Sequence, residues 1–75
     1  MEGGHREKGI ALLKKILKDN PHHTPSLIHL GNLYRHMGKT LKAIETHQQA
    51  VDQDRDNPRA LQCLADDFAA AGQTE

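Results

Sequence analysis

The packing residues of this chain recur at an interval of 34 positions, and this repeat constrains the fold more than any other feature. Leu27 and Leu61 occupy equivalent positions, as do Tyr34 and Phe68. The same interval relates Leu30 to Leu64, Gly31 to Ala65, Gly38 to Gly72, Gly4 to Gly38, Gly9 to Ala43, Ile10 to Ile44 and Leu17 to Val51. Repeats of this length are small supersecondary units that bury their apolar faces by stacking on their neighbours.

Glycine and proline divide the chain into four segments of about 13 to 15 residues, each with apolar residues at a helical period. We expect Thr24 to cap the second helix with Pro25 at its first position, and Asn57 with Pro58 to begin the fourth. Gly38 predicts a left-handed helix end and a very short turn, which makes the flanking helices antiparallel. The inner face predicted for the third helix comprises Leu41, Ile44, His47 or Gln48, and Val51, with Ala43 and Ala50 small for close contact.

Residues 24–57 resemble one complete tetratricopeptide repeat, whose pattern places large, small and aromatic residues at set offsets. The matching residues are Leu27, Leu30, Gly31, Tyr34, Gly38, Ala43 and Ala50. Residues 6–23 resemble the second helix of a preceding repeat, and residues 58–72 resemble the first helix of a following one. The resemblance implies a single domain over residues 1–75, all-α, with four antiparallel helices in a short right-handed superhelix.

Some positions depart from the repeat pattern. Leu13 and His47 stand where an aromatic residue is expected, and Arg55 replaces the closing proline. Within the family, several short strings are similar to bacterial envelope-biogenesis proteins of the lipopolysaccharide-assembly type. These strings are residues 31–35, 43–44, 47–48 and 66–72. Such proteins also carry a membrane anchor and a rubredoxin-like metal domain, and neither is present in these residues.

The charge balance and the scarcity of aromatic residues favour a protein or peptide partner. Ten basic and ten acidic residues leave no net charge, whereas nucleic acids and anionic membranes attract a basic excess. Only Tyr34 and Phe68 are aromatic, so a base-stacking platform is not expected. No apolar stretch approaches the roughly 20 residues of a membrane span. Residues 1–8 lack the apolar core of a signal peptide, so we expect a cytoplasmic location.

The resemblance implies a protein–protein interaction module, or scaffold, whose first helices line a concave groove that holds a peptide or helix of a partner. The residues that it places in this groove are His29, Asn32, Arg35, His36, Arg59, Gln62, Cys63 and Asp66, together with Ile28 and Ala70. Asn32 would bond the ligand's backbone, because an amide both donates and accepts. Ile28 and Cys63 stand where chaperone-binding members use Lys and Arg, so we do not expect a clamp for chaperone tails. The alternative for these groove residues is a solvated surface without a ligand.

The last helix suggests a second kind of function. Leu61, Leu64 and Phe68 would normally be covered by a following helix. We expect this face to be covered by a second copy or by the remainder of a longer protein. The alternative to a groove binder is therefore a structural self-assembly unit, a homodimer or larger homo-oligomer, that pairs through its terminal helices.

The six histidines raise the question of a metal site. His29 and His36 are seven residues apart, or about 10 Å along a helix. Two ligands of one zinc ion must each lie about 2 Å from the ion, so His29 and His36 cannot bind the same ion. His29 and Cys63 are equivalent residues on neighbouring first helices and remain the one candidate pair. His22 and His23 are expected in a loop, and we expect neither a metal nor a cofactor.

The residues raise two other possible functions, catalysis and membrane-surface binding. A nucleophilic Cys63 would need a nearby base and an oxyanion hole, and neither is evident, so we expect an inert buried cysteine and no enzyme activity. The neighbouring Asp66 and Asp67 favour its thiol form. Lys14, Lys15 and Lys18 form a small basic face, which we interpret as a solvated surface of a packed helix.

Overall fold

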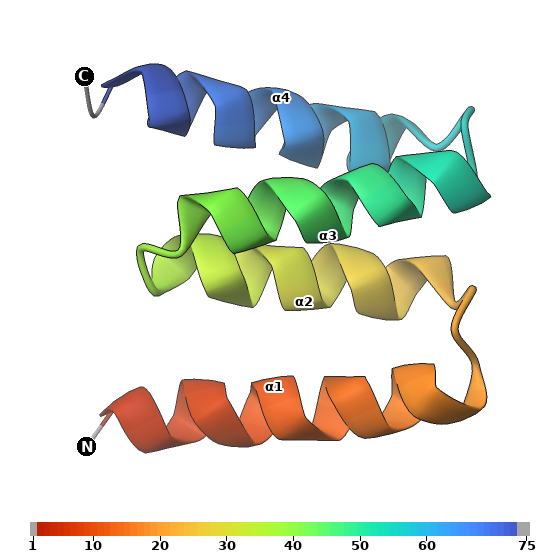
Figure 1. Ribbon diagram of the computed structural model, residues 1–75, viewed down its shortest axis with the longest axis vertical. Coiled ribbons are helices and arrows are strands. Elements are labelled where there is room, and N and C mark those ends of the chain that lie inside the picture. The colour runs from red at the N-terminus through yellow and green to blue at the C-terminus, as the bar shows by residue number, and fades with distance from the viewer. Residues whose placement is uncertain (1, 74–75) are drawn as a thin grey trace.

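Four helices lie side by side in chain order in the computed structural model, which describes the backbone of residues 2–73 and the side chains of residues 5–72 (Figure 1). They are α1 (Glu2–Asp19), α2 (Thr24–His36), α3 (Thr40–Gln53) and α4 (Pro58–Gln73). Consecutive helices run antiparallel, and the described residues contain no strand. The all-α, antiparallel prediction is therefore confirmed.

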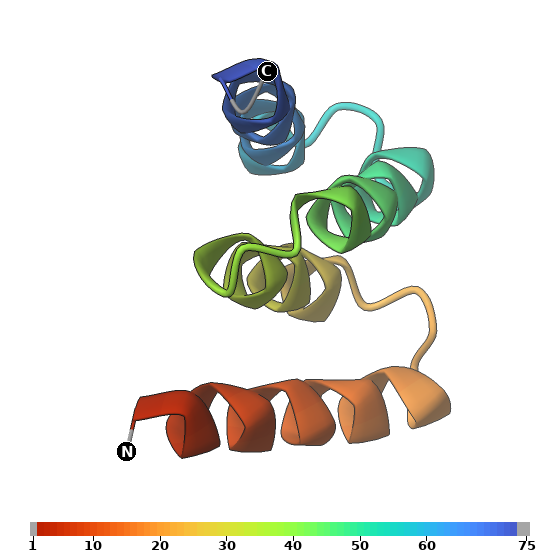
Figure 2. The same cartoon turned by 60° about the vertical axis from the view of Figure 1, so that its left-hand side comes forward.

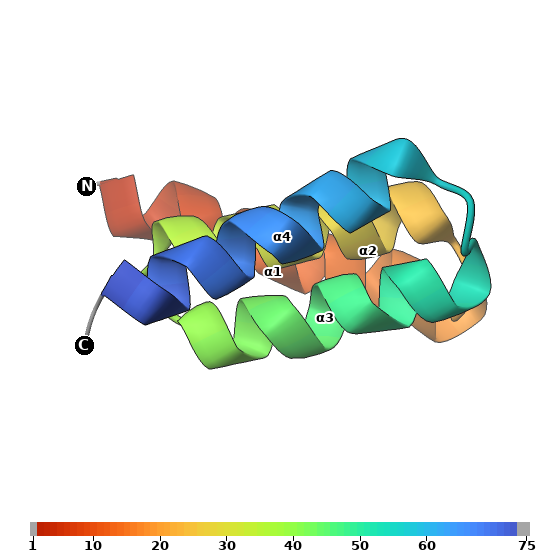
Figure 3. The same ribbon diagram turned by 90° about the horizontal axis from the view of Figure 1, so that it is seen from above.

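The helices form a thin curved layer with extents of 36 × 35 × 15 Å. Figure 2 shows how each helix is displaced from the one before, so that the layer bends as it grows from α1 to α4. α2 and α3 form the most extensive helix pair, and α2 also contacts α4. Seen from above, α3 is displaced to one side of α2 and α4 (Figure 3). Helices α2 and α4 thus share one side of the layer and line a common surface (Figure 3).

Helix α1 differs from its predicted range of 6–23. It spans Glu2–Asp19, so Gly3 and Gly4 do not interrupt it. Its last turn closes with the amide of Asn20 donating to the carbonyl of Ile16 at 2.9 Å. Pro21 has no amide proton and cannot extend this ladder. Residues 20–23 form a turn, so the helix ends at the break expected at Pro21, whereas its start lies before residue 6.

The predicted cap of α2 is also wrong. Thr24 is the first helical residue, and His23 occupies the N-cap position without a side-chain bond to the backbone. Instead, the Nδ1 atom of His23 lies 2.6 Å from the hydroxyl of Ser26. Pro25 falls in the first turn, where a missing amide proton costs nothing. The helix therefore starts one residue earlier than expected.

The predicted start of α4 is confirmed. The Asn57 side-chain oxygen accepts hydrogen bonds from the amides of Arg59 at 2.9 Å and Ala60 at 3.2 Å. These two donors are among those that a helix start leaves without an intrahelical partner. The cap holds the loop before α4 in place, and with it one edge of the groove described below.

The predicted left-handed end of α2 is confirmed at Gly38. Its φ is +80°, the only positive φ among the described residues. The Lys39 amide donates to the Tyr34 carbonyl at 2.8 Å, and the Gly38 amide donates to the Arg35 carbonyl at 3.0 Å. This conformation reverses the chain within three residues and brings α3 directly against α2.

We expect Gly38→Ala to lower the free energy of unfolding by about 1 kcal/mol, because the Cβ atom of an L-residue destabilises the left-handed conformation. Gly72→Ala is the matched control. Gly72 lies inside α4 at negative φ with open space around it, so alanine there is expected to be neutral or stabilising. Urea denaturation followed by circular dichroism measures both changes. Equal effects of the two substitutions would contradict the role given to Gly38.

The core comprises two clusters that join all four helices. The first consists of Leu27, Ile28, Ala50, Ala60 and Cys63, with Leu17 and Val51 packed against it. The second consists of Leu30, Tyr34 and Ala43, with Ile10, Leu13 and Leu17 packed against it. The predicted small contact residues Ala43 and Ala50 are fully buried.

Leu41 is the misplaced residue of the predicted inner face of α3. Its side chain is 76% exposed, and Thr46 is buried instead. Leu41 precedes Ala43 by two residues, which rotates it by about 200° around the helix axis. Because Ala43 faces the core, Leu41 faces away from it.

Candidate binding groove

A groove of about 730 Å³ lies between α2 and the beginning of α4. Its lining residues are Pro25, Ile28, His29, Asn32, Leu33, His36, Asn57, Arg59 and Cys63. The lining includes five of the eight predicted groove residues: His29, Asn32, His36, Arg59 and Cys63. All lining residues lie on α2, on α4 or in the loop that leads into α4, because α2 and α4 share one side of the layer.

The groove combines apolar and polar surface. Ile28 and Cys63 belong to the core and present little surface, whereas His29, His36 and Arg59 are exposed. Arg59 is the only Lys or Arg side chain in the lining, and no carboxylate lies there. Apolar surface with a few placed polar groups is the usual composition of a binding site.

Asn32 has unused hydrogen-bonding capacity within the groove. Its side chain is half-buried, and its Oδ1 atom is buried without a hydrogen-bond partner in the part of the chain that the structure describes. A buried acceptor left unpaired costs about 1–3 kcal/mol. Rotation of the amide would turn this acceptor toward the groove, where a donor from a bound segment, such as a backbone N–H, would remove that cost.

Three predicted groove residues do not line the groove but lie near one another on α2 and α4. The Nη1 atom of Arg35 is 3.7 Å from the Oδ2 atom of Asp66 and 3.6 Å from the Oδ1 atom of Asp67. Gln62 donates from Nε2 to the Oδ1 atom of Asp66 at 3.0 Å. These side chains bind one another, and their part in binding a ligand stays a prediction.

Three lining residues were not among the predicted groove residues. Asn57 was interpreted only as a helix cap, and Pro25 only as a helix start. Leu33 lies at the edge of the apolar stripe of α2, where it also approaches Gly9 of α1. A helical projection of α2 places Leu33 beside His29 and His36, so the signal for this residue was present.

A fully buried pair, His47 and Asp67, joins α3 to α4. The Nε2 atom of His47 donates to the backbone carbonyl of Ile28 at 3.1 Å. Nδ1 and the Oδ2 atom of Asp67 share a hydrogen bond. A carbonyl only accepts, so Nε2 must carry a proton, and the bond between Nδ1 and Asp67 holds one more. The pair therefore connects three helices, because Ile28 lies on α2.

This pair was not foreseen. The sequence predicts only His47 or Gln48 on the inner face of the third helix, and it relates Asp67 only to Cys63. The repeat carried a signal, since a shift of 34 places Asp67 on Leu33. A carboxylate at an apolar packing position requires a buried partner, and His47 is the side chain that supplies it.

The Cys63 thiol is buried at the edge of the groove. Burial raises the pKa of this thiol, and the carboxylates of Asp67 and Asp66 raise that pKa further. The Arg35 guanidinium and a hydrogen bond from Asn32 oppose the rise. The thiol form is therefore favoured over the reactive thiolate.

We expect Cys63 to react with a disulfide reagent such as DTNB at least about tenfold more slowly in the folded chain than in denaturant at pH 8. Because the pKa of the thiol is raised, its rate should still increase at pH values where an ordinary thiol is fully ionised. The chain has a single cysteine, so the absorbance change reports this site alone. Equal rates in both states would contradict the burial of Cys63.

Across the side chains that the structure describes, no three His, Cys, Asp or Glu residues are grouped so that they could hold a metal ion. Among the described helices, none has the length and apolar character needed to cross a membrane.

Comparison with known proteins agrees with this architecture. The family model described as tetratricopeptide repeat matches residues 1–66. No curated protein matches the sequence. The finer resemblance to lipopolysaccharide-assembly proteins, the bacterial origin, the cytoplasmic location and the division into half, full and half repeats stay predictions.

Proposed function

The chain belongs to the tetratricopeptide repeat family, and on this premise we propose that it is a non-catalytic module that holds an extended segment of a partner protein in the groove between α2 and α4. Repeats of this family generally mediate protein–protein interaction and are typically non-catalytic. Stacked helix pairs present extended concave surfaces for this purpose.

The observation that carries the proposal is Asn32, an amide of the groove lining whose buried Oδ1 atom has no hydrogen-bond partner among the described residues and would face the groove after rotation of the amide. An acceptor in this state favours a ligand that brings a donor at a fixed place, and every residue of an extended segment except proline carries a backbone N–H. A partner side chain would supply such a donor only where the partner's sequence happens to place one. The groove is therefore suited to main-chain recognition.

The lining also limits the chemistry of the partner. Pro25 and Leu33 offer apolar contact, and Arg59 supplies a fixed positive charge with no carboxylate beside it in the groove. We propose a segment that places an apolar side chain over α2 and a carboxylate near Arg59. Ile28 and Cys63 are core residues without charge, so a clamp of the chaperone-tail type is not part of this proposal.

The test starts from peptides selected against the whole chain from a displayed random library. We expect Asn32→Ala and Arg59→Ala each to raise the dissociation constant of a selected peptide at least about tenfold, through one lost hydrogen bond or ion pair to a charged group. Isothermal titration calorimetry measures the constant. Both positions lie at the groove surface, so the circular dichroism spectrum should stay unchanged.

Gln49→Ala is the matched control for this experiment, because Gln49 is an exposed amide on α3 outside the groove lining. This control should leave peptide affinity unchanged. Peptides that bind all three variants as tightly as the original chain would rule out the groove as the binding site.

A second candidate function is self-assembly through the terminal helices, and the exposed face of α4 favours it. Leu61 and Phe68 are 46% and 56% exposed, which is unusual for large apolar side chains on one helix face. Leu64, the third predicted residue of this face, is half-buried. The two functions use different surfaces and are compatible in one molecule.

A further inference from the structure

Helices α4 and α1 lie at opposite ends of the layer, and each exposes a face that is buried in its equivalent helix (Figure 1). The interval of 34 residues relates α4 to α2 and α1 to α3. α2 and α3 form the most extensive pair in the molecule.

The exposed residues of α4 match buried residues of α2. Leu61 is 46% exposed, whereas the equivalent Leu27 is 3% exposed and packs in one cluster with Ala50 of α3. Phe68 is 56% exposed, whereas the equivalent Tyr34 is 7% exposed and packs with Ala43 of α3. The face that α2 turns toward α3 is thus present on α4, with no described helix to cover it.

The exposed residues of α1 match buried residues of α3 in the same way. Leu12 is 61% exposed, and its equivalent Thr46 is 7% exposed. Ile16 is 36% exposed, and its equivalent Ala50 is fully buried. Because both α1 residues are larger and more apolar than their equivalents, this face would bury more apolar surface in a pairing than α3 does at these positions.

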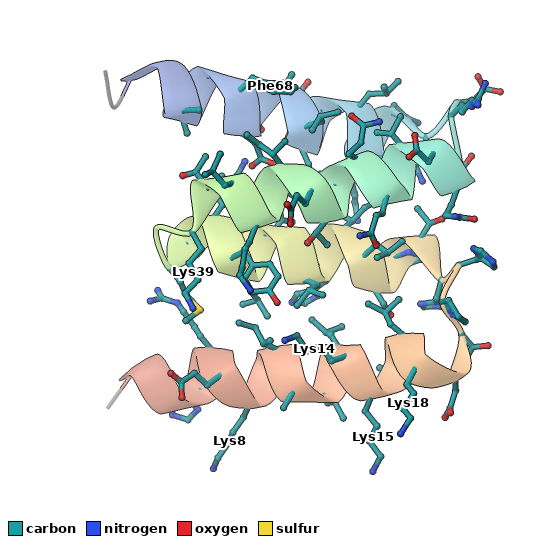
Figure 4. The ribbon with its side chains drawn as sticks, in the orientation of Figure 1. Lys8, Lys14, Lys15, Lys18, Lys39 and Phe68 are labelled. Atoms are coloured by element: carbon teal, nitrogen blue, oxygen red, sulfur yellow. The ribbon has the colours of Figure 1, made fainter. Side chains whose placement is uncertain are left out.

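For one specific contact of the α2–α3 pair, the equivalents of the two contacting residues lie on the two end helices. The Nζ atom of Lys42 lies 5.6 Å from the centroid of the Tyr34 ring, a cation–π distance. The equivalent residues are Lys8 on α1 and Phe68 on α4. Figure 4 shows both side chains, Lys8 pointing away from α2 and Phe68 on the opposite end helix. Within one molecule they cannot meet, but between two molecules they can.

The charges of the two ends are complementary. Residues 1–19, at the α1 end, contain five Lys or Arg and three Asp or Glu, whereas residues 58–75, at the α4 end, contain one and three. Pairing α4 with α4 would bring two acidic ends together, and pairing α1 with α1 would bring two basic ends together. Pairing α4 with α1 brings opposite charges together, and complementary charge selects register and partner.

We infer that a second copy of this chain covers the exposed face of α4 with its own α1, in the geometry of the α2–α3 pair. The inference rests on the self-assembly function proposed above and specifies its geometry. Leu61 and Phe68 of one copy pack against Leu12 and Ile16 of the next, with Lys8 of that next copy over the Phe68 ring. The contact uses two different surfaces, so it is heterologous and leaves a free α1 face and a free α4 face at the two ends. Copies therefore add in a head-to-tail row that lengthens with concentration.

The test is sedimentation equilibrium of the chain and of two variants, Leu12→Glu and Phe68→Glu. The average mass of the original chain should rise continuously with concentration, beyond that of a dimer. Each variant alone should raise the dissociation constant at least about tenfold, because a carboxylate would be buried against apolar surface. An equimolar mixture should form a dimer of one copy of each variant and stop there, since the Leu12→Glu copy keeps its α4 face and the Phe68→Glu copy keeps its α1 face.

The control is Leu41→Glu, which changes an equally apolar residue that is 76% exposed and lies on neither end face. It should self-associate like the original chain. A chain that stays monomeric at all concentrations, or a mixture that forms no mixed dimer, overturns the inference. A Leu12→Glu variant that still forms dimers alone also overturns it, because that result indicates an α4–α4 contact.

The groove variants separate this inference from the first proposed function. Asn32→Ala should leave the self-association unchanged, and Phe68→Glu should leave the affinity for a groove peptide unchanged. A chain that self-associates but binds no groove peptide would contradict the groove proposal alone. A chain that binds a groove peptide but does not self-associate would contradict the α4–α1 contact alone. The affinity between copies should also fall with added salt, as the charge complementarity of the ends requires.

Discussion

Asp67→Leu is expected to lower the free energy of unfolding by about 3 kcal/mol, because it leaves His47 fully buried without its partner. A domain of this size has a total stability of the order of 5 kcal/mol. The variant should therefore be close to unfolding at room temperature. His47→Leu is expected to cost a similar amount, since it leaves the Asp67 carboxylate buried with only Arg35 near it, at 3.6 Å. Urea denaturation followed by circular dichroism measures both.

The double variant His47→Leu with Asp67→Leu should recover most of this loss. The chain already contains the apolar version of this pair, because Leu13 and Leu33 occupy the equivalent positions on α1 and α2. Replacing a buried polar pair by apolar residues of similar volume is often neutral or stabilising. We therefore expect a coupling of about 3 kcal/mol in the double-mutant cycle.

Asp66→Leu is the matched control for Asp67→Leu. The Asp66 side chain is 49% exposed and lies 3.7 Å from Arg35, so its loss is expected to cost less than about 1 kcal/mol. Additive costs in the His47 and Asp67 cycle would show that the two side chains do not interact. Equal costs at positions 66 and 67 would show that burial of the carboxylate is unimportant.

Gly31→Ala is expected to destabilise the chain by about 2 kcal/mol, although alanine is the better helix former. A Cβ atom at position 31 would lie 2.8 Å from the Cε1 atom of His47 and closer still to Cδ2 and Nε2 of the same ring. The ring cannot give way, because Ile28 and Asp67 hold both of its nitrogens. The midpoint of urea unfolding is the measurement.

The sign of the Gly31→Ala effect separates packing from helix propensity. Gly72→Ala, with open space around it, should be neutral or stabilising for the reason given above. If Gly31→Ala also stabilises the chain, then α2 and α3 do not approach as closely as described. Combining Gly31→Ala with His47→Ala should relieve the overlap, so the Gly31→Ala cost should be smaller in that background.

Much of the fold was predictable because local chemistry determines it. The left-handed end at Gly38 and the cap at Asn57 depend on a few adjacent residues, and both predictions are confirmed. The antiparallel order follows from short turns between helices. The errors occur where a residue has two possible roles, as at Thr24, or where a helix face is assigned from size alone, as at Leu41.

The groove was predictable in position but not in full. The repeat register places first helices side by side, which is why the predicted residues His29, Asn32 and Arg59 meet in one lining. The repeat register alone does not show which side chains are held in ion pairs and therefore do not line the groove. Arg35 and Asp66 are held by each other, and this depends on the distance between α2 and α4.

The repeat of 34 residues determined the helix order, the register and the close contacts at Ala43 and Ala50, because interhelical packing recurs with the same small and large residues. Only the tertiary structure decided that His47 and Asp67 form a buried pair, since their partnership depends on how α4 crosses α3. It also decided which equivalent residues are covered. Leu27 and Leu61 have the same identity and the same place in the repeat, yet one is buried and the other exposed, because burial is a property of neighbours rather than of sequence.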